Sequence, residues 1–141
     1  MHEDLQFNIA GGLGFDLPQM ARVRQAFEHH KIDDVAGAVT NEMAREDIKA
    51  KVKPGAKIAV GVGSRGVANI DVAVKALIAS LKELGADPFI FPAMGSHAGG
   101  TSEGQEALLA GYGVTEDKMG APVRATMDTV VVAELEGGTK I

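Results

Sequence analysis

The sequence predicts a single α/β domain, Rossmann-like in type, with parallel strands, helical crossovers and a helical N-terminal region. Two short apolar runs, residues 57–63 and 89–91, are bounded by glycine or proline and are typical of strands; the first is expected to be buried on both faces. Between them, leucine, isoleucine and valine recur at helical spacing, which predicts a crossover helix beginning at Asn69 or Asp71 and stopped by Gly85. Strands joined by such a crossover pair in parallel.

The N-terminal part of the domain divides into an arm, residues 1–16, and a helical lead-in, residues 17–50, ahead of the α/β core at 56–141. In the lead-in, apolar residues near helical spacing predict a helix from Leu17 to His30. A second helix is expected to be capped by Asp33 or Asp34 and to end near residues 49–51. Two helices therefore precede the first strand of the sheet.

Beyond the second strand, the pattern predicts two more helical pieces and a closing hairpin. Ser102 and Gln105 have the spacing of a capping box, and a helical turn is expected at 115–118. The β-branched run at 129–135 predicts a strand, followed by a turn at 136–138 and the start of a returning strand at 139–141. One interpretation is that this is simply a short closing strand. Because a strand of two or three residues is a poor ending, we favour the alternative that the chain is a fragment of a longer two-domain protein.

Composition excludes several function classes. The chain has 141 residues, 45% of them hydrophobic, which suits one core. A net charge of −5 with scattered Lys and Arg argues against nucleic acid as a partner. The absence of cysteine excludes disulfides and thiolate metal sites. Residues 1–4 lack the basic and apolar pattern of a signal peptide, and no apolar run approaches the length of a membrane span. We expect a soluble cytoplasmic protein that does not bind membranes.

The first strand leads into a glycine-rich loop, residues 61–66, that contains Arg65. The loop matches the Gly-x-Gly-x-x-Gly fingerprint of dinucleotide sites, but the acidic residue expected at the end of the next strand is missing. A purely structural interpretation is that the glycines permit a tight turn and Arg65 is a solvated surface residue. Alternatively, Arg65 and free backbone N–H groups at a helix start clamp a carboxylate or phosphate.

The second strand leads into another glycine-rich loop, residues 94–100, that contains His97. His97 is either a loop histidine bonded to nearby backbone or, since imidazole exchanges protons near neutrality, an acid/base residue. No second ligand stands at chelating spacing, so no metal site is expected from these residues. Ser64 or Ser96 as a nucleophile is a further alternative, although neither lies in a Gly-x-Ser-x-Gly elbow.

Residues 58–70 and 92–113, with their Gly-Ser-Arg-Gly and Met-Gly-Ser-His motifs, resemble the N-terminal domain of the nickel-dependent lactate racemase family, most closely an uncharacterised branch of it. The resemblance implies that Arg65 positions the substrate carboxylate and that His97 is one of two acid/base histidines. It also implies a nickel pincer nucleotide as cofactor. Its attachment lysine, nickel-binding histidine and second acid/base histidine would belong to sequence beyond Ile141.

Two positions depart from the family's pattern. An aspartate three residues before the arginine is Val62 here, and the residue after the histidine is Ala98 rather than arginine. Lactate itself is therefore in doubt as substrate. The resemblance points instead to a racemase or epimerase of some 2-hydroxy acid, whose N-terminal half this chain would supply.

The site prediction combines the two loops. We expect His97 to be catalytic, and we assign cofactor contacts to Gly63 and Gly66, although no cofactor is expected on the fragment alone. Substrate contacts are assigned to four residues: Ser64, Arg65, Gly95 and Ser96. The missing C-terminal domain is the expected partner, and the fragment is expected to be inactive. Alternatives are a stand-alone binding module for a small anion or nucleotide, and a non-catalytic interaction subunit or homo-oligomer.

Overall fold

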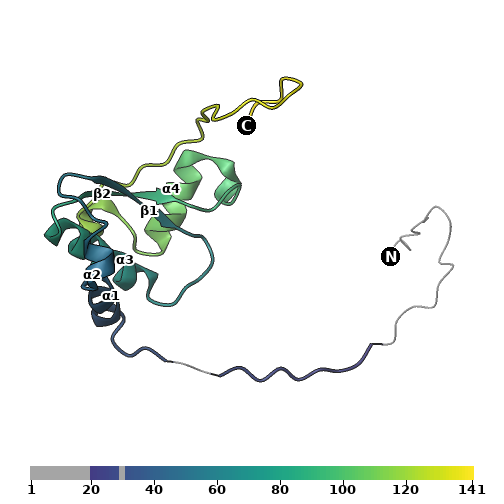
Figure 1. Cartoon of the computed structure of the whole chain (residues 1–141). Helices are drawn as coiled ribbons and strands as arrows, with labels where there is room; N and C mark the ends of the chain where they lie inside the picture. The colour runs from purple at the N-terminus through teal and green to yellow at the C-terminus, as the bar shows by residue number, and fades with distance from the viewer. Residues whose placement is uncertain (1–19, 29–30) are drawn as a thin grey trace. The chain divides into compact units, whose positions relative to one another are not determined.

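The computed structural model describes residues 20–28 and 31–141 (Figure 1). The chain divides into two units, Met1–Lys31 and Ile32–Ile141. The described part is of the α/β class: it contains five α-helices, one 3-10 helix and a parallel sheet of two strands. This confirms the predicted class and the parallel pairing. Within the residues described, no helix has both the length and the apolar character needed to span a membrane.

The predicted helix from Leu17 to His30 is wrong where the structure describes it. Residues 20–28 contain neither helix nor strand. The apolar side chains that suggested a helical face are exposed, among them Met20, Val23 and Phe27. A short amphipathic helix is stable mainly when its apolar face is packed, and these side chains have no such packing. The predicted arm at 1–16 lies outside the described residues.

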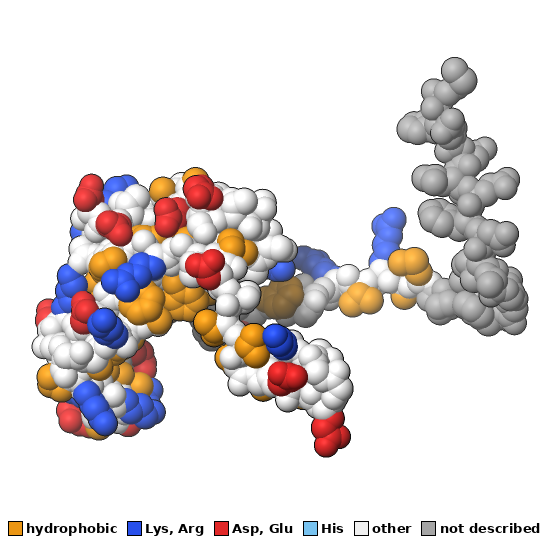
Figure 2. All heavy atoms as spheres, turned by 90° about the horizontal axis from the view of Figure 1, so that it is seen from above, with side chains coloured by type: hydrophobic (Ala, Val, Ile, Leu, Met, Phe, Trp, Pro, Cys, Tyr) orange, Lys and Arg blue, Asp and Glu red, His pale blue; other side chains and the backbone are white. Residues whose placement is uncertain are grey.

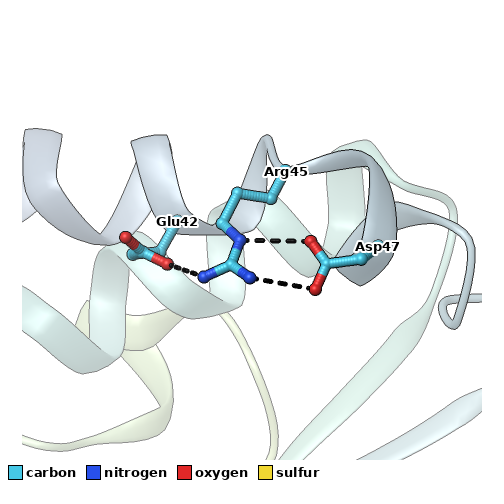
Figure 3. A network of polar contacts seen from close by, with 3 residues as sticks. All are labelled: Glu42, Arg45 and Asp47. Carbon is cyan, nitrogen blue, oxygen red and sulfur yellow. Dashed lines mark hydrogen bonds and ion pairs between the residues drawn. The ribbon is translucent and has the colours of Figure 1, made fainter.

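Helix α1, Val35–Met43, begins as predicted at Asp34, whose Oδ1 accepts a hydrogen bond of 2.8 Å from the Gly37 amide. The helix does not continue to residues 49–51. Arg45 adopts an extended conformation and a separate short helix follows, α2 at Glu46–Lys49. Around this break the Arg45 guanidinium bonds both Asp47 oxygens and one oxygen of Glu42 (Figure 3). These interactions, with Asp47 first and Glu42 second, raise the pKa of Arg45.

The sheet consists of β1, Lys57–Val62, and β2, Asp87–Pro92, lying side by side in Figure 1. The register pairs Val60 with Ile90 and Val62 with Pro92, so both strands end together. The crossover helix α3, Ile70–Glu83, begins between the two predicted starts, Asn69 and Asp71, with Asn69 as N-cap. Its end is also as predicted, since Gly85 follows with a positive φ of 82°.

The core lies on one face of the sheet. Val60, Val62 and Ile90 face it from the strands, and Ile78 and Leu109 face it from helices. The expectation that β1 is buried on both faces is wrong, because Lys57, Ala59 and Gly61 are exposed. No described helix packs over those residues, so β1 has the alternating burial of a strand covered on one side only.

After β2 come a 3-10 turn, Ala98–Gly100, helix α4, Ser102–Gly111, and helix α5, Glu116–Met119. The predicted capping box at α4 is wrong by one residue. Thr101 is the N-cap, and its Oγ1 accepts from the Gly104 amide at 3.1 Å. Gln105 is buried and bonds elsewhere. The α5 turn agrees with the prediction at 115–118.

The chain then passes the free side of β2 and leaves the core. Val123 forms a single parallel bridge with Ile90. The predicted strand at 129–135 is wrong as a regular strand, since the segment has only an isolated bridge, between Glu134 and Lys140, and a few backbone hydrogen bonds that join Val132, Ala133 and Leu135 to Thr139 and Ile141. The turn at 136–138 is confirmed, because the Leu135 amide bonds the Thr139 carbonyl at 2.9 Å across it.

Candidate functional site

The two glycine-rich loops meet at the carboxyl end of the sheet. Because β1 and β2 are parallel and in register, the loop after Val62 and the loop after Pro92 emerge at the same edge. Together they border a cavity of about 440 Å³. Its lining comes from both loops and the start of α3: Gly63, Ser64, Arg65, Val67, Ile70, Ala93, Met94 and His97. Cavities of similar volume occur elsewhere, so this one is distinguished by its chemistry.

Ser64 and His97 make the direct contact between the loops. The Ser64 Oγ and the His97 Nδ1 are hydrogen-bonded, although 33 positions separate the two residues in sequence. Ser64 is half-buried and His97 is exposed at the cavity. In the described part of the chain no hydrogen bond involves the other ring nitrogen, Nε2. The ring is thus held on one side and open to a ligand on the other.

Arg65 brings the cation of the site. It is exposed and lines the same cavity as His97. Among the described residues, no Asp or Glu forms an ion pair with it, in contrast to Arg45 and Lys49, which pair with carboxylates around the break between α1 and α2. An unpaired guanidinium beside an imidazole is suited to bind a carboxylate or phosphate, which it can hold through two parallel hydrogen bonds.

Helix α4 fixes the backbone of both loops. Near its beginning, Gln105 Nε2 donates to the Gly95 carbonyl at 2.7 Å. At its end, the Tyr112 hydroxyl donates to the Ser64 carbonyl at 2.6 Å. One helix therefore sets the position of the first loop and the second loop relative to each other. This arrangement gives the site a more rigid frame than exposed loops have by themselves.

The second loop also has an unusual backbone just after His97. Ala98 has a φ of 54°, a left-handed conformation that residues with a side chain seldom adopt. Its carbonyl oxygen lies so close to α4 that a Cβ on Gly104 would be 2.1 Å from it. Gly104 is therefore required for the loop to pack against the helix as it does.

The structure places the remaining predicted residues outside the cavity wall. Gly66, Gly95 and Ser96 are exposed and do not line it, although the Gly95 carbonyl is anchored by Gln105. Within the described ranges, no group of three or more His, Asp or Glu is placed to hold a metal ion. On the face shown in Figure 2, basic and acidic side chains are mixed and form no continuous basic stripe.

Two residues of the site were missed from sequence. Gln105 was assigned to a capping box, and Tyr112 was not considered. Tyr112 carries a weak signal, since it is the single tyrosine of the chain and stands between two glycines at the end of a predicted helix. Gln105 offers none, because its spacing from Ser102 fits a capping box equally well.

A Ser–His contact also occurs in enzymes that use a serine nucleophile. That chemistry needs a third group that orients the base, and the base normally faces the hydroxyl with one nitrogen and this third group with the other. In the described part of the chain, no carboxylate bonds His97. The geometry fits an oriented histidine better than an activated serine.

Comparisons with known proteins do not assign the chain to a family. A scan against models of protein families finds no match, and searches of curated proteins and of solved structures find no significant match. The resemblance to the lactate racemase family therefore stays a prediction based on the two loop motifs.

Proposed function

We propose that this chain is the N-terminal substrate-binding and catalytic half of a nickel-dependent racemase or epimerase of 2-hydroxy acids. The observation that carries the proposal is the shared cavity, where an unpaired Arg65 and the Ser64-bound ring of His97 face the same space. The motif resemblance adds the reaction class. We further propose that the two strands belong to a Rossmann-like sheet and that the protein acts in the cytoplasm.

The two side chains would divide the work on the substrate. The Arg65 guanidinium binds the carboxylate and fixes the orientation of the molecule. The His97 ring then takes the proton of the 2-hydroxyl group while the configuration of the α-carbon is being inverted, and it returns a proton in the reverse step. Ground-state binding rests mainly on Arg65, and proton transfer rests on His97.

The nickel pincer nucleotide is proposed for the full-length protein only. When bound, such a group would supply the acceptor for the hydride of the α-carbon. The described residues do not fit a nickel site, since none of their His, Asp and Glu side chains form a group of three. Following the family resemblance, we propose that the metal ligands and the attachment lysine belong to a C-terminal domain of a longer protein and that this chain alone is inactive.

The test is turnover of a panel of 2-hydroxy acids by the full-length, nickel-loaded protein. His97→Ala should lower kcat by about a hundred- to ten-thousand-fold, because a positioned acid/base group is lost. His2→Ala, a substitution of the N-terminal histidine, serves as the control and should leave turnover unchanged. Unchanged turnover in His97→Ala would remove the catalytic role.

A small-anion binding module is the second candidate, and the unpaired Arg65 is the observation that favours it. In that case lactate or phosphate should raise the melting temperature of this chain without any partner domain. Arg65→Ala should abolish the shift, whereas Arg124→Ala, an exposed arginine over the Phe89 ring, should not. Stabilisation that persists in Arg65→Ala would exclude this site as the binding site.

An interaction subunit or homo-oligomer is the third candidate. It is favoured by the exposed valines at 130–132, which together form an apolar surface on an extended segment. Solution scattering or sedimentation of the chain would decide it, since a monomer at micromolar concentration excludes stable self-association.

A further inference from the structure

The contact between Ser64 and His97 has a consequence for the state of the imidazole. A neutral histidine carries its proton on one of two nitrogens, and the hydrogen bond at the other decides which tautomer dominates. Here Nδ1 is the bonded nitrogen, while Nε2 has no partner in the described part of the chain. A serine hydroxyl can accept from Nδ1–H, which leaves a lone pair at Nε2, or donate to an unprotonated Nδ1, which leaves the proton on Nε2.

We propose that Ser64 is the positioning residue of His97. Its Oγ accepts a hydrogen bond from Nδ1–H, which fixes the tautomer with a free lone pair at Nε2. Nε2 is then the atom that exchanges a proton with the substrate hydroxyl. This inference rests on the proposed function of His97 and adds the residue that orients it.

Ser64 is well placed for this role because it is held from two sides. Its side chain bonds His97, and its carbonyl accepts the 2.6 Å hydrogen bond of the Tyr112 hydroxyl. Tyr112 is half-buried at the end of α4, so the anchor belongs to the folded body of the protein. The position of the imidazole is thereby linked to a helix instead of depending on the loop alone.

The proton balance of the step is simple. The Nε2 lone pair takes the hydroxyl proton of the substrate, and the ring becomes an imidazolium whose Nδ1–H still donates to Ser64. When Nε2 gives the proton back, the original tautomer is restored. The bond at Nδ1 is the same before and after, so Ser64 neither gains nor loses a proton. A hydroxyl acceptor thus serves both directions of a reversible reaction.

Nitrogen NMR of this 141-residue chain with ¹⁵N-labelled histidine tests the proposal directly. At alkaline pH, where imidazole is neutral, His97 should show a protonated Nδ1 and an unprotonated Nε2. Ser64→Ala should shift the ring toward the Nε2–H tautomer that free histidine prefers. Ser64→Thr, which keeps the hydroxyl, should restore the original tautomer. Ser96→Ala, the serine beside His97 with no bond to its ring, is the matched control.

A wild-type ring protonated at Nε2, or a tautomer that does not change in Ser64→Ala, would overturn the proposal. The wild-type spectrum decides the matter even if Ser64→Ala fails to fold. In the full-length enzyme, Ser64→Ala should lower kcat about two- to tenfold, the worth of one neutral hydrogen bond, with less change in KM. If His97→Ala keeps its activity, the proposed function fails, whereas a wrong tautomer in an enzyme that needs His97 refutes the role of Ser64 alone.

Discussion

Two runs of valine in this chain have opposite surroundings. Val60 and Val62 of β1 are 7% and 2% exposed, whereas Val130, Val131 and Val132 are 80%, 61% and 74% exposed. Both runs are β-branched and apolar, which favours extended structure. The first has a strand beside it and helices over one face. The second has only the short contacts of a terminal hairpin.

The difference shows that β-branched, apolar residues form a regular strand only where a neighbouring strand pairs with them. Helix α3 returns the chain alongside β1, so that β2 pairs with it over the full length of both strands. The site depends on this pairing, because the loops of Ser64 and His97 meet only where paired strands end. The segment from residue 126 onward is exposed throughout and carries none of the site residues.

The largest expected loss of stability comes from a substitution in the paired strands β1 and β2. Ile90 is fully buried, pairs with Val60 and bridges to Val123, so Ile90→Ala leaves a cavity at the centre of the core. We expect the free energy of unfolding to fall by about 2–5 kcal/mol in urea denaturation. Val131→Ala should change it by less than about 0.5 kcal/mol, because its side chain is exposed. Equal losses in the two variants would contradict the comparison.

The same contrast explains how far sequence could predict this molecule. The periodic segments at α1, β1, α3 and α5 were found because apolar spacing and end signals such as Asp34 and Gly85 act locally. The meeting of Arg65 and His97 at one edge followed from parallel pairing. The helix predicted at 17–30, in its described part 20–28, and the strand predicted at 129–135 were wrong, because each needs a packing partner and local pattern does not report whether one exists.

The hydrogen bonds from α4 to the two loops could not be predicted from local sequence pattern for the same reason. Tyr112 and Gln105 act on residues 48 and 10 positions away, and their targets are backbone carbonyls, which leave no trace in side-chain identity. The N-cap of α4 shows that the exact first residue of a helix is also hard to predict from sequence. Thr101 and Ser102 are both good capping residues, and only the path of the second loop decides between them.

A smaller effect is expected where α4 contacts the second loop. Gly104→Ala would place a Cβ 2.1 Å from the Ala98 carbonyl, so the backbone beside His97 must move. We expect a loss of about 1–3 kcal/mol in unfolding free energy, despite the better helix propensity of alanine. Gly111→Ala is the matched control in the same helix, because nothing lies within 4 Å of its Cβ position.

Chemical shifts of the second loop would show whether this contact or the helix itself is responsible. In Gly104→Ala the amides around His97 should move, while those of the hairpin at 134–140 should stay. In Gly111→Ala neither set should move, and stability should be unchanged or slightly higher. A Gly104→Ala protein as stable as Gly111→Ala would mean that the close approach of the loop has no energetic consequence.

The smallest expected loss of stability comes from removing the hydrogen bond between Tyr112 and the first loop, and it tests whether this bond holds the loop alone or the sheet as well. Tyr112→Phe keeps the ring and removes only the hydroxyl that donates to the Ser64 carbonyl. That carbonyl lies in a half-buried residue and can turn to water, so the loss should be about 0.5–1.5 kcal/mol in urea denaturation. Hydrogen exchange should rise in the loop at 63–66 and remain unchanged in β1 itself. If β1 loosens equally, Tyr112 supports the whole sheet, and the first loop is not an independently anchored element.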